Sequence, residues 1–360
     1  MAVDLTILPA GIAAAATELA KKIEFESVND KGANGYVLIG RNRQLARKVV
    51  VKFYFWGDGA HAEPKLLADL ASPNVLEVHD AAAIDEDDAY FVTPFCEHGD
   101  LDDVIAAGGI GVRQAVDMLL QVASGASFIH GKGYVHRDLK PSNVFKRGDG
   151  SLLIGDFGSV VRKGDGGYAE TKSRHSLLYR SPEEIATDRS YEQSDIYQLG
   201  ILFYQLLGGR LPYQMMDWLN AKEKSEYANL PHPDNELYAI EAFERRIISK
   251  GRLLDLDSLP PWCPSGLRGV IRTCCKVDRT KRFESVSALI TKLNNLRASL
   301  PDWRCEPEPV LYRPRAKFRI VGSTGSFSIE KMVSSGTAWR KVRAAKPSTL
   351  REAVEAAERL

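Results

Sequence analysis

Two short stretches of the sequence hold side chains that together can move a phosphoryl group. Residues 136–143 read HRDLKPSN, and residues 156–158 read DFG. Phosphoryl transfer needs a carboxylate that receives the proton of the attacking hydroxyl, a cation that offsets phosphate charge, and oxygen ligands for Mg²⁺. The candidates for these roles are the carboxylate of Asp138, the ammonium of Lys140, and the oxygens of Asn143 and Asp156.

In this order and at this spacing, the two stretches resemble the catalytic loop and the metal-binding motif of eukaryotic-type protein kinases. The resemblance implies an α+β, two-lobed fold with a small β-rich N-lobe and a large helical C-lobe. It also implies an enzyme that transfers the γ-phosphoryl group of ATP, with Mg²⁺ or alternatively Mn²⁺, to hydroxyls of a protein substrate. Lys140, two residues after Asp138, resembles the Ser/Thr-specific branch.

A glycine-rich turn between two predicted strands is expected to approach the ATP phosphates through backbone N–H groups. Gly32 and Gly35 fit this turn, although Asp30 stands where the family pattern begins with glycine. Lys52 ends a VVVK run that resembles the kinase VAIK motif. A lysine that ends such a buried strand needs a phosphate or a carboxylate as partner. By resemblance, Val37 and Val50 cover one face of the adenine.

The carboxylate partner expected for Lys52 is Glu63. Glu63 directly precedes Pro64, and proline is tolerated only in the first turn of a helix. We therefore expect Glu63 at a helix N-terminus.

The inter-lobe hinge is expected at residues 89–101, with Thr93 at the gatekeeper position. Adenine recognition there uses the carbonyl of Pro94 and the backbone of Cys96, and Phe145 forms the floor of the pocket. Proline lacks an N–H group but keeps its acceptor.

Residues 156–183 resemble an activation segment that ends in YRSPE. Ser176 falls where a hydroxyl binds Asp138 and Lys140. The hydroxyls of Thr171, Ser173 and Ser176 are candidate phosphorylation sites. Arg137 either pairs with a phosphate of this segment or with a fixed acid. Three further residues, with structural roles by resemblance, are Asp195, which braces the catalytic loop, and the pair Glu183 and Arg282.

Composition indicates an ordinary globular chain. Hydrophobic residues make up 44% of the 360 residues, charged residues 26%, and the net charge is +1. The cysteines show no disulfide or metal-binding spacing, and no apolar run is long enough to cross a bilayer. We therefore predict a cytoplasmic protein without a membrane partner. The five cysteines, expected to be reduced, are Cys96, Cys263, Cys274, Cys275 and Cys305.

Three regions are expected: an N-terminal extension at 1–22 with a helix at about 11–22, the kinase domain at 23–298 (N-lobe about 23–95, C-lobe about 96–298), and a basic appendage at 299–360. The charged segment 217–264 is predicted to be a helical insert. In the appendage, apolar alternation at 310–321, 326–332 and 337–342 predicts three strands of a β-β-β-α unit. Its last helix begins at the capping box Thr349-Leu350-Arg351-Glu352.

The basic strands of the appendage allow three interpretations: binding of nucleic acid or an acidic protein, docking on the kinase domain, or plain solvation. Their basic residues are Arg313, Arg315, Lys317, Arg319, Lys331, Arg340, Lys341, Arg343 and Lys346. An alternative to the enzyme is therefore a pseudokinase-like scaffold that binds a partner or nucleic acid through this tail. Asp30 favours the scaffold, and the complete set Lys52, Asp138, Asn143 and Asp156 favours the enzyme.

Overall fold

A computed structural model describes residues 3–32, 35–55, 70–170, 176–250, 253–323, 325–343 and 347–360. The chain divides into two compact units, Met1–Leu101 with Gln121–Asp195, and Asp102–Leu120 with Ile196–Leu360. The expected α+β fold, with a β-rich N-terminal part and a helical C-terminal part, is confirmed. The predicted boundaries at residues 22/23 and 298/299 stay predictions.

The first unit begins with an antiparallel sheet in the order β1-β2-β3-β5-β4. Its strands are β1 (Ile23–Gly32), β2 (Gly35–Asn42), β3 (Lys48–Phe55), β4 (Asp80–Ala83) and β5 (Asp88–Pro94). Because side chains alternate along a strand, Val49, Val51 and Phe53 of β3 share one face, while Val50 and Lys52 share the other.

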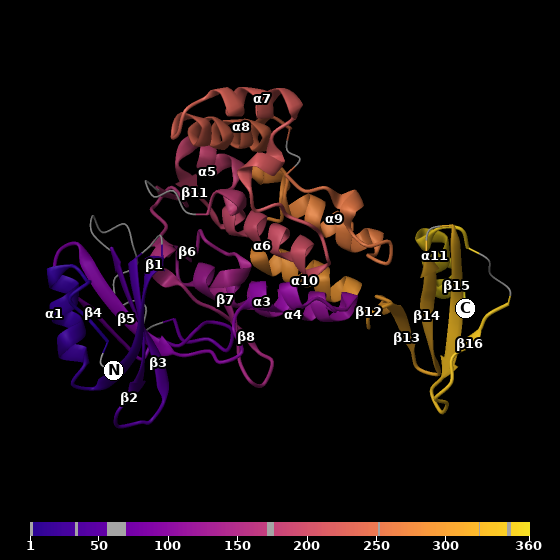
Figure 1. Ribbon diagram of the computed structural model, residues 1–360, viewed down its shortest axis with the longest axis horizontal. Coiled ribbons are helices and arrows are strands. Elements are labelled where there is room, and N and C mark those ends of the chain that lie inside the picture. Colours follow the sequence, from indigo (N-terminus) through magenta and orange to yellow (C-terminus); the bar gives the residue numbers. More distant parts are fainter. Residues whose placement is uncertain are drawn as a thin grey trace. The chain divides into compact units, whose positions relative to one another are not determined.

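Helix α1 (Ala10–Leu19) packs on the face that carries Val51 (Figure 1). Its residues Ile12, Ala16 and Leu19 join the strands in one buried cluster. The predicted helix at residues 11–22 therefore forms, but it ends earlier, because the chain turns at Lys21 and Lys22 into β1. Packing on the sheet is its role in this unit.

The rest of the first unit surrounds the catalytic stretch with short elements. The last part of α4 (Val112–Gly131) leads into β6 (Tyr134–Val135), which pairs with β9 (Val161–Arg162), while β7 (Val144–Lys146) pairs with β8 (Leu152–Ile154). Single turns of 3₁₀ helix form the ends of the two motifs as η2 (Pro141–Asn143) and η3 (Phe157–Ser159). The remaining elements are β10 (Ala169–Glu170), η4 (Leu177–Tyr179), α5 (Pro182–Thr187), β11 (Arg189–Ser190) and the start of α6 (Glu192–Leu206).

The second unit is helical up to residue 297. The charged segment 217–264 forms two helices that pack on each other, α7 (Ala221–Asn229) and α8 (Asp234–Lys250). No helix in the described ranges is long and apolar enough to cross a membrane. The other helices of this unit are α3 (Leu101–Ala107), η5 (Met215–Trp218), η6 (Leu256–Ser258), α9 (Ser265–Cys274), η7 (Arg279–Lys281) and α10 (Val286–Arg297).

The appendage ends the second unit as an antiparallel sheet with one helix. Its strands follow one another as neighbours: β12 (Asp302–Cys305), β13 (Pro309–Arg313), β14 (Ala316–Ser323), β15 (Ser326–Val333) and β16 (Arg340–Lys341). The expected strand at 310–321 is a hairpin, because Pro314 and Arg315 form a turn. Helix α11 (Leu350–Arg359) has the predicted capping box and packs on β14 and β15 (Figure 1).

A carboxyl group on α5 is buried without full compensation. Glu184 is 4% exposed, and its Oε2 has no hydrogen-bond partner among the described residues. Burial raises the pKa of Glu184 to about 7, although the charges of Arg137 and Arg180 act in the opposite direction. The folded protein therefore holds a proton here that the unfolded chain releases near pH 4.5.

We predict that Glu184→Gln flattens the pH dependence of the free energy of unfolding. In the parent, stability falls as pH rises from about 4.5 to about 7, because only the unfolded chain loses the proton in this range. Glutamine has no proton to lose, so above pH 7 the variant should be more stable than the parent by up to about 3 kcal/mol. Urea unfolding between pH 5 and 8 measures this.

The exposed Glu86→Gln serves as the matched control and should follow the parent. Parallel stability curves for Glu184→Gln and the parent would contradict the prediction.

Candidate active site

The side chains of the catalytic stretch converge on one buried carboxylate. Asp138 is 1% exposed, and its Oδ2 accepts hydrogen bonds from Lys140 Nζ (2.8 Å) and Asn143 Nδ2 (2.9 Å). Asn143 Nδ2 also donates to the Asp138 carbonyl (2.8 Å). The other carboxylate oxygen, Oδ1, is buried and has no partner among the residues that the structure describes. Asp138 is therefore held rigidly by one oxygen and presents the second as an unsatisfied acceptor.

Asp195, at the start of α6, holds the backbone of this loop. Its Oδ1 accepts from Arg137 N (2.8 Å), and its Oδ2 accepts from His136 N (2.8 Å) and His130 Nε2 (2.6 Å). Burial alone would raise the pKa of Asp195, but His130, His136 and these hydrogen bonds outweigh it, so the pKa lies below its usual range. Arg137 adopts φ 70°, which is costly for a non-glycine residue. The anionic Asp195 compensates this strain.

The imidazole of His136 connects the two motifs. Its Nε2 lies 3.0 Å from the carbonyl oxygen of Gly155, and its Nδ1 lies 3.3 Å from Asp138 N. Burial lowers the pKa of His136, so the ring is neutral. A neutral ring with Nε2 protonated donates to Gly155 and accepts from Asp138 N–H. His136 thus fixes Asp138 relative to the strand that precedes Asp156.

Lys52 and Asp156 form a largely buried ion pair between Nζ and Oδ1. Burial would raise the pKa of Asp156, but the charge and hydrogen bond of Lys52 outweigh it, so the pKa lies below its usual range. Asp156 adopts φ 57°, a second strained backbone position in the site. Asp156 is therefore an anion, with one oxygen engaged by Lys52.

Three aromatic rings connect the sheet to this ion pair. Tyr54 of β3 lies 5.5 Å from Phe91 of β5, and Phe91 lies 5.8 Å edge-on from Phe157, measured between ring centroids. All three are buried, and burial raises the pKa of Tyr54 well above its usual range. Phe157 directly follows Asp156, so this aromatic ladder helps to set the position of the carboxylate.

The expected phosphate-binding turn joins β1 to β2, and its end at Gly35 lies close to the backbone of β3. Gly32 pairs with Gly35 across the turn, whose residues 33 and 34 lie outside the described ranges, as does the side chain of Asp30. Gly35 has φ 121°, and a Cβ there would lie 1.9 Å from the Phe53 carbonyl oxygen. Only glycine fits this position.

The residues expected around the adenine lie on neighbouring strands. Val37 pairs with Lys52, and Val50 pairs with Thr93, which is 2% exposed. Pro94 ends β5, and the backbone continues to Cys96.

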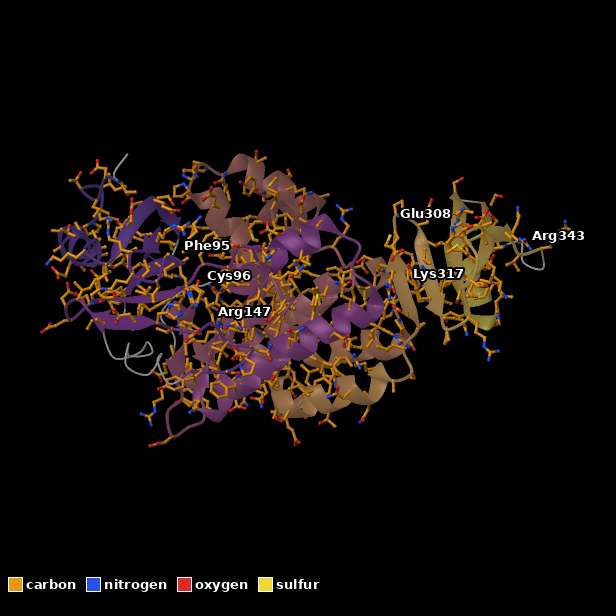
Figure 2. The ribbon with its side chains drawn as sticks, turned by 90° about the horizontal axis from the view of Figure 1, so that it is seen from below. Phe95, Cys96, Arg147, Glu308, Lys317 and Arg343 are labelled. Atoms are coloured by element: carbon orange, nitrogen blue, oxygen red, sulfur yellow. The ribbon has the colours of Figure 1, made fainter. Side chains whose placement is uncertain are left out.

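Beyond β5, Cys96 lies near Arg147 (Figure 2). Burial raises the pKa of the Cys96 thiol, while Arg147 opposes the shift. Phe145 fits beside Gly155, where a Cβ would lie 2.6 Å from its ring.

In the activation segment, Ser176 is engaged by the catalytic loop. Lys140 Nζ donates to Ser176 Oγ (2.6 Å) while it also holds Asp138. Glu183 Oε1 accepts from Ser194 Oγ (2.6 Å). Arg282 belongs to the second unit, where it donates to the carbonyls of Lys276 and Val277, so its pairing with Glu183 stays a prediction. Three predicted residues lie outside the described ranges: Glu63, Thr171 and Ser173.

The oxygens of Asn143 and Asp156 suit a hard divalent ion. Asn143 uses its amide nitrogen for Asp138, and Asp156 uses Oδ1 for Lys52, which leaves one oxygen of each side chain as a donor. Carboxylate and amide oxygens are ligands that Mg²⁺ prefers. The residues present therefore fit a magnesium ion that is completed by water and phosphate oxygens.

Several residues of the site were missed from the sequence. His130 and the ring of His136 carry no signal beyond their place in or near a motif, and Glu184 is indistinguishable there from Glu183. Tyr54 and Phe91 could have been found, because they occupy the same strand face as Lys52 and Thr93 in alternating patterns. Gly155 could have been found from its place directly before Asp156.

Comparisons with known proteins agree with this geometry. A family model described as "Protein kinase domain" matches residues 30–293. The chain is 34% identical over 199 residues to "Serine/threonine-protein kinase pkn2" of Myxococcus xanthus, covering 51% of this chain and 24% of that protein. It is 30% identical over 227 residues to "Probable serine/threonine-protein kinase PknB" of Lactococcus lactis, covering 62% of this chain and 32% of that protein. The chain thus spans about a quarter to a third of these relatives. Because the matched residues are most of the chain and contain both motifs, the chain belongs to the protein kinase domain family.

Proposed function

We propose that the chain transfers the γ-phosphoryl group of ATP to serine and threonine hydroxyls of protein substrates. The observation that carries this proposal is the state of Asp138, whose Oδ2 is fixed by two donors while its buried Oδ1 has none. A buried acceptor without a donor is costly, and a substrate hydroxyl is the donor that satisfies it. In that position Asp138 orients the hydroxyl and receives its proton.

The two lysines offset charge at different phosphates. Lys52, which pairs with Asp156, is proposed to bind the α- and β-phosphates, because its motif resembles the kinase motif whose lysine does so. Lys140 lies beside Asp138, where the transferred phosphoryl group meets the hydroxyl, and its ammonium stabilises charge that develops during transfer. Asn143 and Asp156 would hold the metal ion, which supplies electrostatic stabilisation of the phosphates when bound.

The adenine is proposed to lie between the β2 and β3 side chains Val37 and Val50 on one side and Phe145 on the other. The carbonyl of Pro94 and the backbone of Cys96 supply the hydrogen bonds. Thr93, buried between Val50 and the pocket, limits its depth.

Specificity for serine and threonine is supported by Lys140, two residues after Asp138, and by the names of the similar proteins. Lys140 also makes a contact with Ser176. This contact fixes the activation segment directly beside Asp138. Ser176 is therefore proposed as a positioning residue. Thr171 and Ser173 remain the proposed sites of autophosphorylation.

We predict that Asp138→Asn lowers kcat by at least about 100-fold, because an amide cannot accept the proton of the hydroxyl. Incorporation of label from γ-labelled ATP into the protein itself and into a generic protein substrate measures the rate. Calorimetry should show that the variant still binds ATP and Mg²⁺.

The exposed Asp149→Asn is the matched control and should keep the parent's rate. Unchanged turnover by Asp138→Asn would remove the basis of the proposal.

For Ser176, we predict that Ser176→Ala lowers kcat by about tenfold with the KM for ATP unchanged. The reason is that the ammonium of Lys140 loses a hydrogen bond worth about 1.5 kcal/mol. Ser176→Thr keeps the hydroxyl and should restore most of the rate. Steady-state kinetics separates the two parameters.

Phosphopeptide mapping of the parent gives a second check. Phosphate on Ser176 in the active enzyme would contradict the positioning role, because it would place a dianion between Lys140 and Asp138.

A further inference from the structure

The basic residues on the two faces of the appendage sheet differ in whether they have acidic partners. Cross-strand pairing aligns one row of residues from β12 to β16: Trp303, Leu311, Phe318, Lys331 and Arg340. The neighbouring row projects from the opposite face: Arg304, Val310, Arg319, Glu330 and Lys341. The face of the first row carries α11, because Trp303 and Phe318 are buried and Trp303 Nε1 donates to Glu358 of that helix (2.8 Å).

On the face opposite to α11, acids compensate the arginines. Arg304 pairs with Asp302 (2.9 Å) and Arg319 pairs with Glu330 (2.7 Å). Tyr312 lies close to the cations of Arg304 and Lys317, 4.1 and 4.3 Å from its ring centroid. Both arginines of this face are therefore compensated by acids, and Lys317, labelled in Figure 2, lies over an aromatic ring.

On the face of α11, the basic residues have no acidic partners. Lys331 and Arg340 stand directly opposite each other on β15 and β16, and both are exposed. Arg313 and Arg315 flank the neighbouring hairpin turn, and Arg313 donates to the carbonyl of Glu358. Within the described part of the chain, no carboxylate side chain forms an ion pair with any of the four. We call Arg313, Arg315, Lys331 and Arg340 the basic strip.

The basic strip costs stability in the free protein. Like charges directly opposite in a sheet are destabilising, and Lys331 with Arg340 is such a pair. Cations on an edge strand can protect a sheet from aggregation, which would explain Arg340 on β16. It does not apply to Arg313, which ends the interior strand β13, or to Arg315, which lies in the hairpin turn. The strip instead suits a ligand that brings several negative charges.

Phosphate fits the strip better than carboxylate alone. Three of the four side chains are guanidinium groups, which bind phosphate in a bidentate manner. From Arg313 on β13 to Arg340 on β16 the strip crosses three strand spacings and two residue steps, roughly 15 Å, which spans several phosphates of a nucleic-acid backbone. Among the described residues, the rings next to the strip are already engaged: Phe318 is buried with Lys331 above it, and Trp339 lies 4.6 Å from the guanidinium of Arg319. Unpaired bases therefore have little free ring surface on which to stack. A duplex, whose bases are already stacked, needs none.

We propose that the basic strip binds the phosphate backbone of double-stranded nucleic acid without reading its sequence. The site lies in the appendage and uses none of the catalytic residues. A further cation, Arg343, follows β16 along the chain and is labelled in Figure 2.

The test is fluorescence anisotropy of the full chain with a labelled 20-base-pair duplex of random sequence at 50 to 200 mM salt. The variant Lys331→Gln/Arg340→Gln removes the opposed pair without adding a new charge. Its Kd should rise at least tenfold, and the slope of log K against log salt should become shallower by about 2, one for each lost cation.

The matched control, Arg304→Gln/Lys317→Gln, removes the same charge from the opposite face and should change the Kd by less than threefold. Both variants should keep the parent's kinase rate, which shows that they are folded. Three outcomes would overturn the proposal: no binding by the parent at 50 mM salt, equal losses in both double variants, or equal or tighter binding of polyglutamate or of vesicles that contain anionic lipid.

Discussion

The hydrogen bonds of Asp195 are the constraint on which the site depends. A single buried carboxylate binds two consecutive backbone N–H groups of the catalytic loop and one imidazole, and it stays charged because these donors surround it. Breaking one partner of such a network leaves an uncompensated buried charge, which is far more costly than the net value of any one bond. The strained backbone of Arg137 and the rigid placement of Asp138 both rest on this residue.

A second constraint comes from apolar packing. The aromatic ladder from Tyr54 through Phe91 to Phe157 ties the DFG motif to the interior of the sheet, on the same strand face as Lys52. The ion pair of Lys52 and Asp156 is thus bounded by rings on one side and by neutral His136 on the other. This environment has few mobile dipoles, so charges in it act strongly on a bound phosphate. The position of Asp156 is therefore set both by the packing of the adjacent Phe157 and by the hydrogen bond from Lys52.

Much of the catalytic centre was predictable because its members are close in sequence. Asp138, Lys140 and Asn143 lie within six residues, so a local loop conformation brings them together wherever the rest of the chain goes. Glu184 was not predictable, because Glu183 beside it has the same chemistry and only the orientation of α5 decides which one is buried. The appendage was predicted as strands and a helix, but the turn at Pro314 was read as part of a strand. The two-residue turn shifts the phase of the alternation, because Arg313 and Ala316 pair on the same face of the sheet, and this shift is the signal that marks the hairpin.

Helix α1 shows that the folded unit around the first sheet extends further towards the N-terminus than the family match does. The family match starts at residue 30, yet the packed cluster that supports β3 extends back to Leu8 and Ile12. A fragment cut at the start of the match would leave Leu38, Val51 and Phe53 facing water and would lose most of β1, the edge strand next to β2. The segment that matches the family model is therefore shorter than the segment needed to bury the face of the sheet that α1 covers.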